Sequence, residues 1–248
     1  PDLIVDGLFG IGLNRDLDED HCDLVYGVTQ AKIPVLAVDC PSGLNADTGK
    51  AMGAAIMAKR TITLGAPKIG LLQPCADDHV GTLEVADRIG LSGNLPDSDQ
   101  LWLTTADMHG MPPERKPSSH KGTHGHVGIL AGSTGYHGAA CLCARAALRA
   151  RPGLVSVFTP AYQAVASHLQ STMVHPWNTD LVEPMSACTA MVIGPGLAGA
   201  DVPDSLRMVA SQMWRESSMP IVGDASALDW LPADETPKDT TRVLTPHP

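Results

Sequence analysis

The chain has 248 residues, of which 44% are hydrophobic and 18% are charged, and its formal net charge is −10. At roughly 150 residues per domain, this length allows one large domain or two smaller ones, and the apolar fraction excludes general disorder. The acidic balance argues against a nucleic-acid-binding domain that depends on phosphate contacts. No run approaches the ~18 consecutive apolar residues of a membrane span, so no membrane insertion is expected.

The six cysteines form no Cys-x-x-Cys pair, and six in this length do not make a disulfide scaffold. We interpret them as small apolar side chains of a protein in the reducing cytoplasm. The chain opens on the apolar run Leu3–Val5 and closes on Val243–Pro248. These abrupt ends suggest an interior fragment whose domains are truncated.

The first 90 residues or so alternate short apolar runs with helical or turn-rich stretches. The strands predicted there are Leu3–Phe9, Pro34–Asp39, Arg60–Leu64 and Thr82–Ala86. Between the first two, Asp18 or Asp20 is a suitable cap for a helix that carries Leu24, Val25 and Val28 on one face. Strand–helix–strand spacing of this size predicts a parallel sheet.

Residues 93–119 are rich in Pro, Ser, Gly and Asp, which predicts a linker between a first domain over 1–92 and a second over 120–248. After the linker the alternation restarts. The predicted strands are Val127–Ala131, Leu154–Phe158, Met191–Ile193, Pro220–Val222 and Arg242–Leu244, and the predicted helices are Gly138–Ala150 and Asp204–Glu216. The sequence therefore predicts two α/β domains.

Polar residues in the first domain follow predicted strands, at the edge where open α/β sheets bind ligands. Gly10 and Gly12 follow Asp6 and allow backbone N–H groups to approach a phosphate. Asp6, Asp39 and Ser42 would meet at one sheet edge, where their oxygens could surround a hard cation. Each segment is also compatible with an ordinary tight turn that binds nothing.

In the second domain, Gly132, Gly135 and Gly138 lead from a strand into a helix N-terminus, which favours an anion site. Their spacing matches neither the dinucleotide-binding nor the Walker pattern. Three further turns also follow strands: Ile193–Leu197, Asp224–Leu228 and Thr245–Pro248.

Taken together, these segments resemble the bifunctional NAD(P)HX repair enzymes, in which an NAD(P)HX epimerase is fused to an ADP-dependent NAD(P)HX dehydratase. VDGLFGIGLNRD, AVDCPSGLNADTG and ITLGAPKIGLL match the epimerase part in order. SHKGTHGHV, GSTGYHGAA, AALRA, VIGPGL, DASAL and VLTPHP match the dehydratase part. The resemblance implies two three-layer αβα domains, a Rossmann-like epimerase half followed by a ribokinase-like dehydratase half, both truncated.

The resemblance also implies roles for individual residues. Asp6 and Ser42 match potassium ligands, and Asp6 is our candidate for the catalytic acid–base group. The residues implied in NAD(P)HX binding are Gly10, Ile11, Gly12, Leu13, Asn14, Arg15, Asp16 and Asp39 in the first domain and Ala139, Gly196 and His247 in the second. The first seven match a phosphate-binding loop.

The implied function is nicotinamide nucleotide repair. NAD(P)HX is a hydrated nicotinamide nucleotide whose C6 hydroxyl has either configuration. The first activity interconverts the R and S forms, and the second dehydrates S-NAD(P)HX to NAD(P)H at the expense of ADP or ATP. We expect a potassium ion, a small-molecule substrate, no nucleic acid or membrane partner, and a cytoplasmic homo-oligomer.

The chain departs from the family pattern in several places. An Asn-Asn-Gly-Gly-Asp loop would precede Pro1, and a Gly-x-Gly-Asp segment with the dehydratase acid would follow Pro248. We therefore expect no dehydratase activity from these 248 residues alone. Ser226 replaces an Asp, and Arg151-Pro152 stands where the family usually has Gly-Ala, so the helix before it is expected to end early.

Two other functions stay open at this point. The chain could be a non-catalytic binding remnant of the same family, which would bind ligand without turnover. It could also be a ribokinase-like vitamin or sugar kinase, although the epimerase-like first domain argues against that function.

Overall fold

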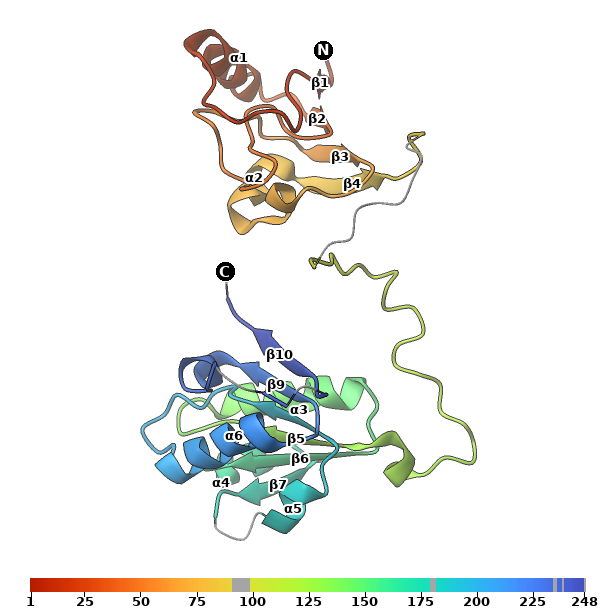
Figure 1. The fold of residues 1–248 in the computed structure, drawn as a ribbon, viewed down its shortest axis with the longest axis vertical. Helices are drawn as coiled ribbons and strands as arrows, with labels where there is room; N and C mark the ends of the chain where they lie inside the picture. Colours follow the sequence, from red (N-terminus) through yellow and green to blue (C-terminus); the bar gives the residue numbers. More distant parts are fainter. Residues whose placement is uncertain (91–98, 179–181, 234–235, 238, 248) are drawn as a thin grey trace. The chain divides into compact units, whose positions relative to one another are not determined.

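The computed structural model describes residues 1–90, 99–178, 182–233, 236–237 and 239–247. The chain separates into two compact units, Pro1–Gln100 and Leu101–Pro248 (Figure 1). Residues 93–98 of the predicted linker lie outside the described residues, and the limits of that linker stay a prediction. Within the described ranges, every helix is too short or too polar to cross a membrane.

The first unit is built on a four-stranded parallel sheet of order β1-β2-β3-β4. The strands are β1 (Ile4–Asp6), β2 (Val35–Val38), β3 (Arg60–Leu64) and β4 (Thr82–Ala86), and the α-helices are α1 (Glu19–Gln30) and α2 (Asp77–Val80). Asp18 is the residue that caps α1, because its carboxylate accepts a hydrogen bond from the N–H of His21 at 3.1 Å.

Only one face of this sheet is covered among the described residues. Ala37 packs in one core cluster with Val25 of α1, Thr61 Oγ1 donates to Val80 O of α2, and both residues are fully buried. On the opposite face, Val5 is 63% exposed, and Val38 and Leu64 are each 37% exposed. Strands added in one direction with right-handed connections keep every connection on the same side. The third layer predicted for this domain is therefore not present in the part of the chain that the structure describes.

The second unit has a six-stranded parallel sheet of order β10-β9-β8-β5-β6-β7. The strands are β5 (His126–Leu130), β6 (Leu154–Thr159), β7 (Met173–Pro176), β8 (Ala190–Ile193), β9 (Ile221–Asp224) and β10 (Arg242–Thr245). The helices are α3 (His137–Arg149), α4 (Tyr162–Ala166), α5 (Val182–Ser186) and α6 (Asp204–Glu216). β7, α4 and α5 were not predicted, because each is too short to show a clear hydrophobic period.

The strand order of the second unit reverses at β5, and this reversal produces three layers. Strands β6 and β7 are added on one side of β5, and β8, β9 and β10 on the other. Right-handed connections then lie on opposite faces. Val155 and Ala144 belong to one core, with α3 and α4, while Phe158 and Leu206 belong to the other, with α6 (Figure 1). The three-layer prediction is confirmed for this unit.

Helix α3 ends at Arg149, and Arg151 adopts a left-handed conformation with φ = 57°. Because this conformation costs a residue with a Cβ about 1 kcal/mol, glycine would fit better there than arginine. We expect Arg151→Gly to raise the free energy of unfolding by about 0.5–1 kcal/mol.

Urea unfolding followed by tryptophan fluorescence measures this gain, since all four tryptophans lie in the second unit. Arg149→Gly, inside the last turn of α3, is the matched control and is expected to lose stability. Equal losses of unfolding free energy in Arg151→Gly and Arg149→Gly would contradict the view that Arg151 is strained by its left-handed conformation.

Candidate functional site

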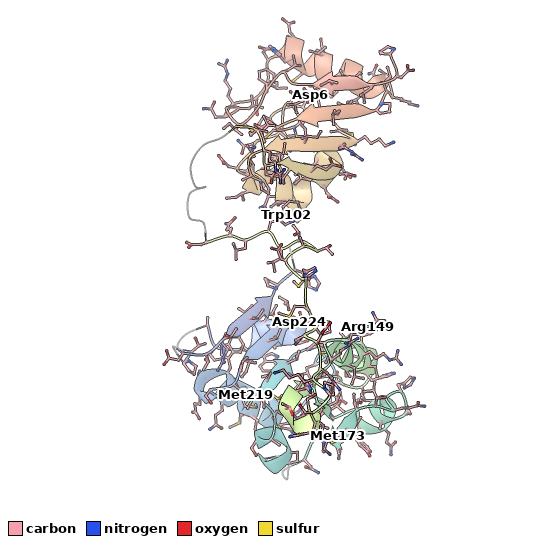
Figure 2. All side chains as sticks on the ribbon, turned by 90° about the vertical axis from the view of Figure 1, so that its right-hand side faces the viewer. Asp6, Trp102, Arg149, Met173, Met219 and Asp224 are labelled. Atoms are coloured by element: carbon pink, nitrogen blue, oxygen red, sulfur yellow. The ribbon has the colours of Figure 1, made fainter. Side chains whose placement is uncertain are left out.

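Asp6 and Ser42 form a buried pair at the carboxyl ends of β1 and β2 (Asp6 is labelled in Figure 2). Ser42 Oγ donates to Asp6 Oδ1 at 2.6 Å, and Ser42 N donates to Asp6 Oδ2 at 2.7 Å. The N–H of Phe9 in turn donates to Ser42 Oγ at 2.9 Å. The structure therefore brings together the two predicted cation ligands, which are 36 residues apart in sequence. Both oxygens of Asp6 are engaged.

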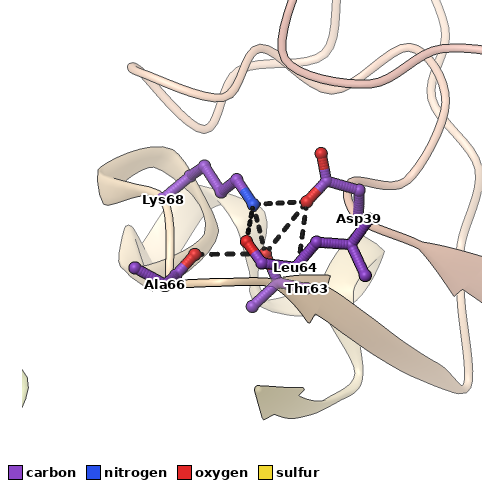
Figure 3. A network of polar contacts seen from close by, with 5 residues as sticks. All are labelled: Asp39, Thr63, Leu64, Ala66 and Lys68. Carbon is purple, nitrogen blue, oxygen red and sulfur yellow. Dashed lines mark hydrogen bonds and ion pairs between the residues drawn. The ribbon is translucent and has the colours of Figure 1, made fainter. Parts of the chain in front are cut away.

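Asp39 lies at the end of the neighbouring strand in a left-handed conformation, with φ = 69°. Its Oδ1 accepts hydrogen bonds from Leu64 N at 3.0 Å, from Thr63 Oγ1 at 3.4 Å and from Lys68 Nζ (Figure 3). Burial raises the pKa of Asp39, but these hydrogen bonds and the charge of Lys68 outweigh it, so the pKa lies below its usual range.

Sequence reasoning missed Lys68, although it is the one cation that contacts Asp39 in the described structure. The available signal was a lysine directly before the apolar run Ile69–Leu72, where a solvated charge is not expected.

The glycine loop runs beside Asp39 along the same sheet edge. A Cβ added to Gly10 would lie 3.5 Å from Asp39 Oδ2. The loop is tied to the unit where Leu13 O accepts from Asn45 Nδ2 at 3.2 Å and where Leu17 N donates to Met52 O at 3.0 Å. The side chains of Ile11, Asn14, Arg15 and Asp16 are exposed. The loop is placed where an anionic ligand could reach its backbone.

In the second unit, the loops that follow β5 and β8 meet at the point where the strand order reverses. A Cβ added to Gly196 would lie 2.9 Å from the Cβ of Ala139, so these two predicted contact residues are neighbours. Ser133 Oγ donates to Gly196 O at 2.7 Å. Open α/β sheets bind ligands at such reversal points.

His247 lies at the same edge, two residues beyond β10, and is exposed. Thr245 Oγ1 donates to Asp224 Oδ1 at 2.7 Å, which joins the ends of β10 and β9 next to it (Asp224 is labelled in Figure 2). Within the described ranges, no hydrogen bond or ring contact joins His247 to Ala139 or Gly196. The structure thus brings Ala139 and Gly196 together and places His247 at the carboxyl edge of the same sheet.

Asp201 clamps the two loops together and was not singled out from the sequence. Its carboxylate accepts from Thr134 N at 3.0 and 3.1 Å and from Thr134 Oγ1 at 2.7 Å. Burial raises the pKa of Asp201, but the hydrogen bonds from Thr134 outweigh it and lower the pKa. The ionised clamp therefore stabilises the fold above the unfolded-state pKa of about 4, and this stability is lost as pH falls through the folded-state pKa.

We expect Asp201→Ala to lower the free energy of unfolding at pH 7 by no more than about 1 kcal/mol, since solvent screens this exposed carboxylate. A double-mutant cycle with Thr134→Val, measured by urea unfolding at several pH values, isolates the clamp. The coupling should vanish at acidic pH. A coupling that persists unchanged at pH 2 would show that ionisation of Asp201 is irrelevant.

Comparison with known proteins finds a matching family model in each unit. Residues 1–70 match the family described as YjeF-related protein N-terminus, and residues 127–248 match the NAD(P)H-hydrate dehydratase family. The bifunctional NAD(P)H-hydrate repair enzyme Nnr of Escherichia coli K12 is 39% identical over 254 aligned positions, which cover 100% of this chain. The chain joins a YjeF-related segment to an NAD(P)H-hydrate dehydratase segment, and over its whole length it is similar to the bifunctional NAD(P)H-hydrate repair enzymes. The resemblance stated from the sequence is thereby confirmed.

Other enzymes with the same description also match the whole chain. The enzymes of Coxiella burnetii and Vibrio cholerae are 36% and 35% identical, again over 100% of this chain. The chain spans about half the length of these relatives, 51% and 50% respectively. The activity of the whole family protein is therefore a proposal for this chain.

Solved structures resemble part of the chain. A hypothetical protein from Streptococcus mutans is 29% identical, with a TM-score of 0.51, and the match covers 59% of this chain and 55% of that one. A ribokinase-like superfamily protein from Enterococcus faecalis V583 is 22% identical, with a TM-score of 0.51, over 63% of this chain and 57% of that one. The expected α/β fold with parallel sheets is confirmed, and the similar solved structures include a protein described as ribokinase-like.

Proposed function

We propose that the protein repairs hydrated nicotinamide nucleotides, with NAD(P)HX epimerisation in the first unit and a part in ADP-dependent or ATP-dependent dehydration in the second. The observation that carries the proposal is the convergence of Asp6, Ser42, Asp39 and the glycine loop at one sheet edge of a YjeF-related unit. Relatives named NAD(P)H-hydrate repair enzymes match the chain across both units.

In the first unit, backbone N–H groups of the loop from Gly10 to Asp16 bind the phosphates, and Arg15 adds a positive charge. Asp39 contacts the substrate, and Asp6 acts as the acid–base group during exchange of the C6 hydroxyl. Asp6 and Ser42 offer only oxygen donors, one of them anionic, which fits part of the ligand shell of a potassium ion. Such an ion would organise the pocket and balance the buried carboxylate.

In the second unit, Ala139 and Gly196 line the substrate pocket, and the His247 imidazole hydrogen-bonds amide or hydroxyl groups of the substrate. A phosphoryl group from ADP or ATP makes the C6 hydroxyl a better leaving group. The homo-oligomeric state and the cytoplasmic location stay predictions.

The proposal is tested by incubating the purified protein with R-NADHX in potassium buffer and following the two epimers by chromatography. We expect S-NADHX to form faster than in a protein-free control, and more slowly when sodium replaces potassium. Conversion at the protein-free rate in both buffers would refute the epimerase proposal. Binding of NADHX without interconversion would instead support a binding role.

A further inference from the structure

The two carboxylate oxygens of Asp39 have different surroundings. Oδ1 accepts from Leu64 N, Thr63 Oγ1 and Lys68 Nζ (Figure 3). Oδ2 points out of this network, and its neighbour is Gly10, whose added Cβ would lie 3.5 Å away. Within the described residues, no hydrogen bond reaches Oδ2. One oxygen is held by the protein and the other faces the loop expected to bind the ligand.

Lys68 is fixed by the same network. Its ammonium group donates to Asp39 Oδ1, to Thr63 Oγ1 at 2.9 Å and to the carbonyl oxygen of Leu64 at 2.9 Å. An ammonium group has three N–H donors, so all of them are used. The side chain is 18% exposed, and that of Asp39 is 19% exposed. Lys68 therefore has no N–H left to donate to a substrate, and its contact with this site is its hydrogen bond to Asp39.

The backbone of Asp39 is held in place as well. Its N–H donates to Ile62 O at 2.8 Å while φ is 69°, a left-handed conformation that aspartate adopts more readily than most residues with a Cβ. This hydrogen bond to β3 fixes the point from which the side chain leaves the backbone. In contrast, Asp6 is 4% exposed and both of its oxygens are engaged by Ser42. Asp39 is therefore the carboxylate of the two with an oxygen that accepts no hydrogen bond from the described residues.

We propose that Lys68 is a positioning residue of the first unit: it anchors Oδ1 of Asp39 so that Oδ2 accepts a hydrogen bond from a hydroxyl or amide donor of the substrate. This inference rests on the proposed epimerase function. The depressed pKa of Asp39 agrees with it, because an ionised carboxylate is the stronger acceptor.

Lys68→Met tests the anchoring, with Lys68→Arg as the conservative variant and the exposed Lys59→Met as the matched control. The pKa of the Asp39 carboxyl group is measured by carbon-detected NMR. We expect it to rise in Lys68→Met, to stay low in Lys68→Arg and to be unchanged in Lys59→Met. An unchanged pKa in Lys68→Met would overturn the inference, whatever the substrate.

The kinetic readout is the dependence of epimerase kcat/KM on pH. In Lys68→Met we expect kcat/KM near neutral pH to fall about tenfold and the acidic limb of the profile to move to higher pH, with partial rescue in Lys68→Arg. If kcat/KM of Lys68→Met fell by the same factor at every pH, or did not fall, the positioning role of Lys68 would be overturned. A wild-type protein that does not interconvert the epimers would refute the proposed function, whereas the NMR measurement still decides on Lys68.

Gly10→Ala tests Oδ2 directly. Its φ is not in the left-handed region and the new methyl would make ordinary contact at 3.5 Å, so folding should be retained. The methyl group would nevertheless occupy the approach to Oδ2, and we expect at least a tenfold loss in kcat/KM. Gly7→Ala, where an added Cβ meets nothing within 4 Å, is the control. Full activity of a folded Gly10→Ala variant would overturn the assignment of Oδ2.

Discussion

Asp6→Asn is expected to reduce the epimerase rate by roughly 100-fold, in line with the loss of acid–base or charge-stabilising groups in other enzymes. The amide keeps the size of the side chain and can still accept a hydrogen bond from Ser42, so the fold is largely retained. It loses the negative charge and the ability to accept a proton. The measurement is the rate of R-to-S conversion of NADHX at several potassium concentrations.

The potassium dependence separates the two proposed roles of Asp6. If the carboxylate holds the ion, Asp6→Asn should also remove the stimulation by potassium. Asp23→Asn, on the exposed side of α1, is the matched control and should leave the rate unchanged. A parallel loss of rate and of melting temperature would assign Asp6 a folding role instead.

Gly194→Ala is expected to destabilise the second unit by at least about 3 kcal/mol. Gly194 has φ = 122°, which side-chain-bearing residues rarely adopt. An added Cβ would also overlap the carbonyl oxygen of Asp224 and lie 2.6 Å from the Cβ of Ala227. These atoms belong to the end of β9 and the turn after it, so relief of the overlap would separate β8 from β9.

Urea unfolding followed by tryptophan fluorescence measures this loss, since the fluorescence reports on the second unit alone. Gly138→Ala is the matched control, because Gly138 lies in α3 and an added Cβ there meets nothing within 4 Å. It should gain up to about 1 kcal/mol from the higher helix propensity of alanine. A Gly194→Ala variant as stable as the wild type would contradict the geometry described above.

Elements with a strong local signal were predicted well from the sequence. The bounds of β3, β4 and α6 agree with the prediction, and Asp18 caps α1 as one of two candidates. The meeting of Asp6 and Ser42 follows from strand ends in a parallel sheet, which share one edge. In these cases the residues of a single strand or helix, with its ends, are enough to predict the structure.

The contacts that were missed depend on how loops fold back. Lys68 reaches Asp39 across 29 positions, and Asp201 reaches Thr134 across 67. No periodicity encodes such pairs, because both partners lie in irregular segments whose conformation is set by the finished sheet. The third layer that is missing among the described residues of the first unit has the same origin, since strand order is a property of the whole sheet and cannot be read from any one strand.

The uncovered face of the first sheet has a consequence for colloidal behaviour. Val5 and Val38 give β1 and β2 an apolar surface, whereas Arg60 and Glu84 place an ion pair of 2.7 Å on the same face of β3 and β4. Charges of this kind oppose self-association of exposed sheets. We therefore expect replacement of Arg60 and Glu84 by apolar residues to lower the solubility of the protein more than its free energy of unfolding, because an exposed ion pair adds little to folding.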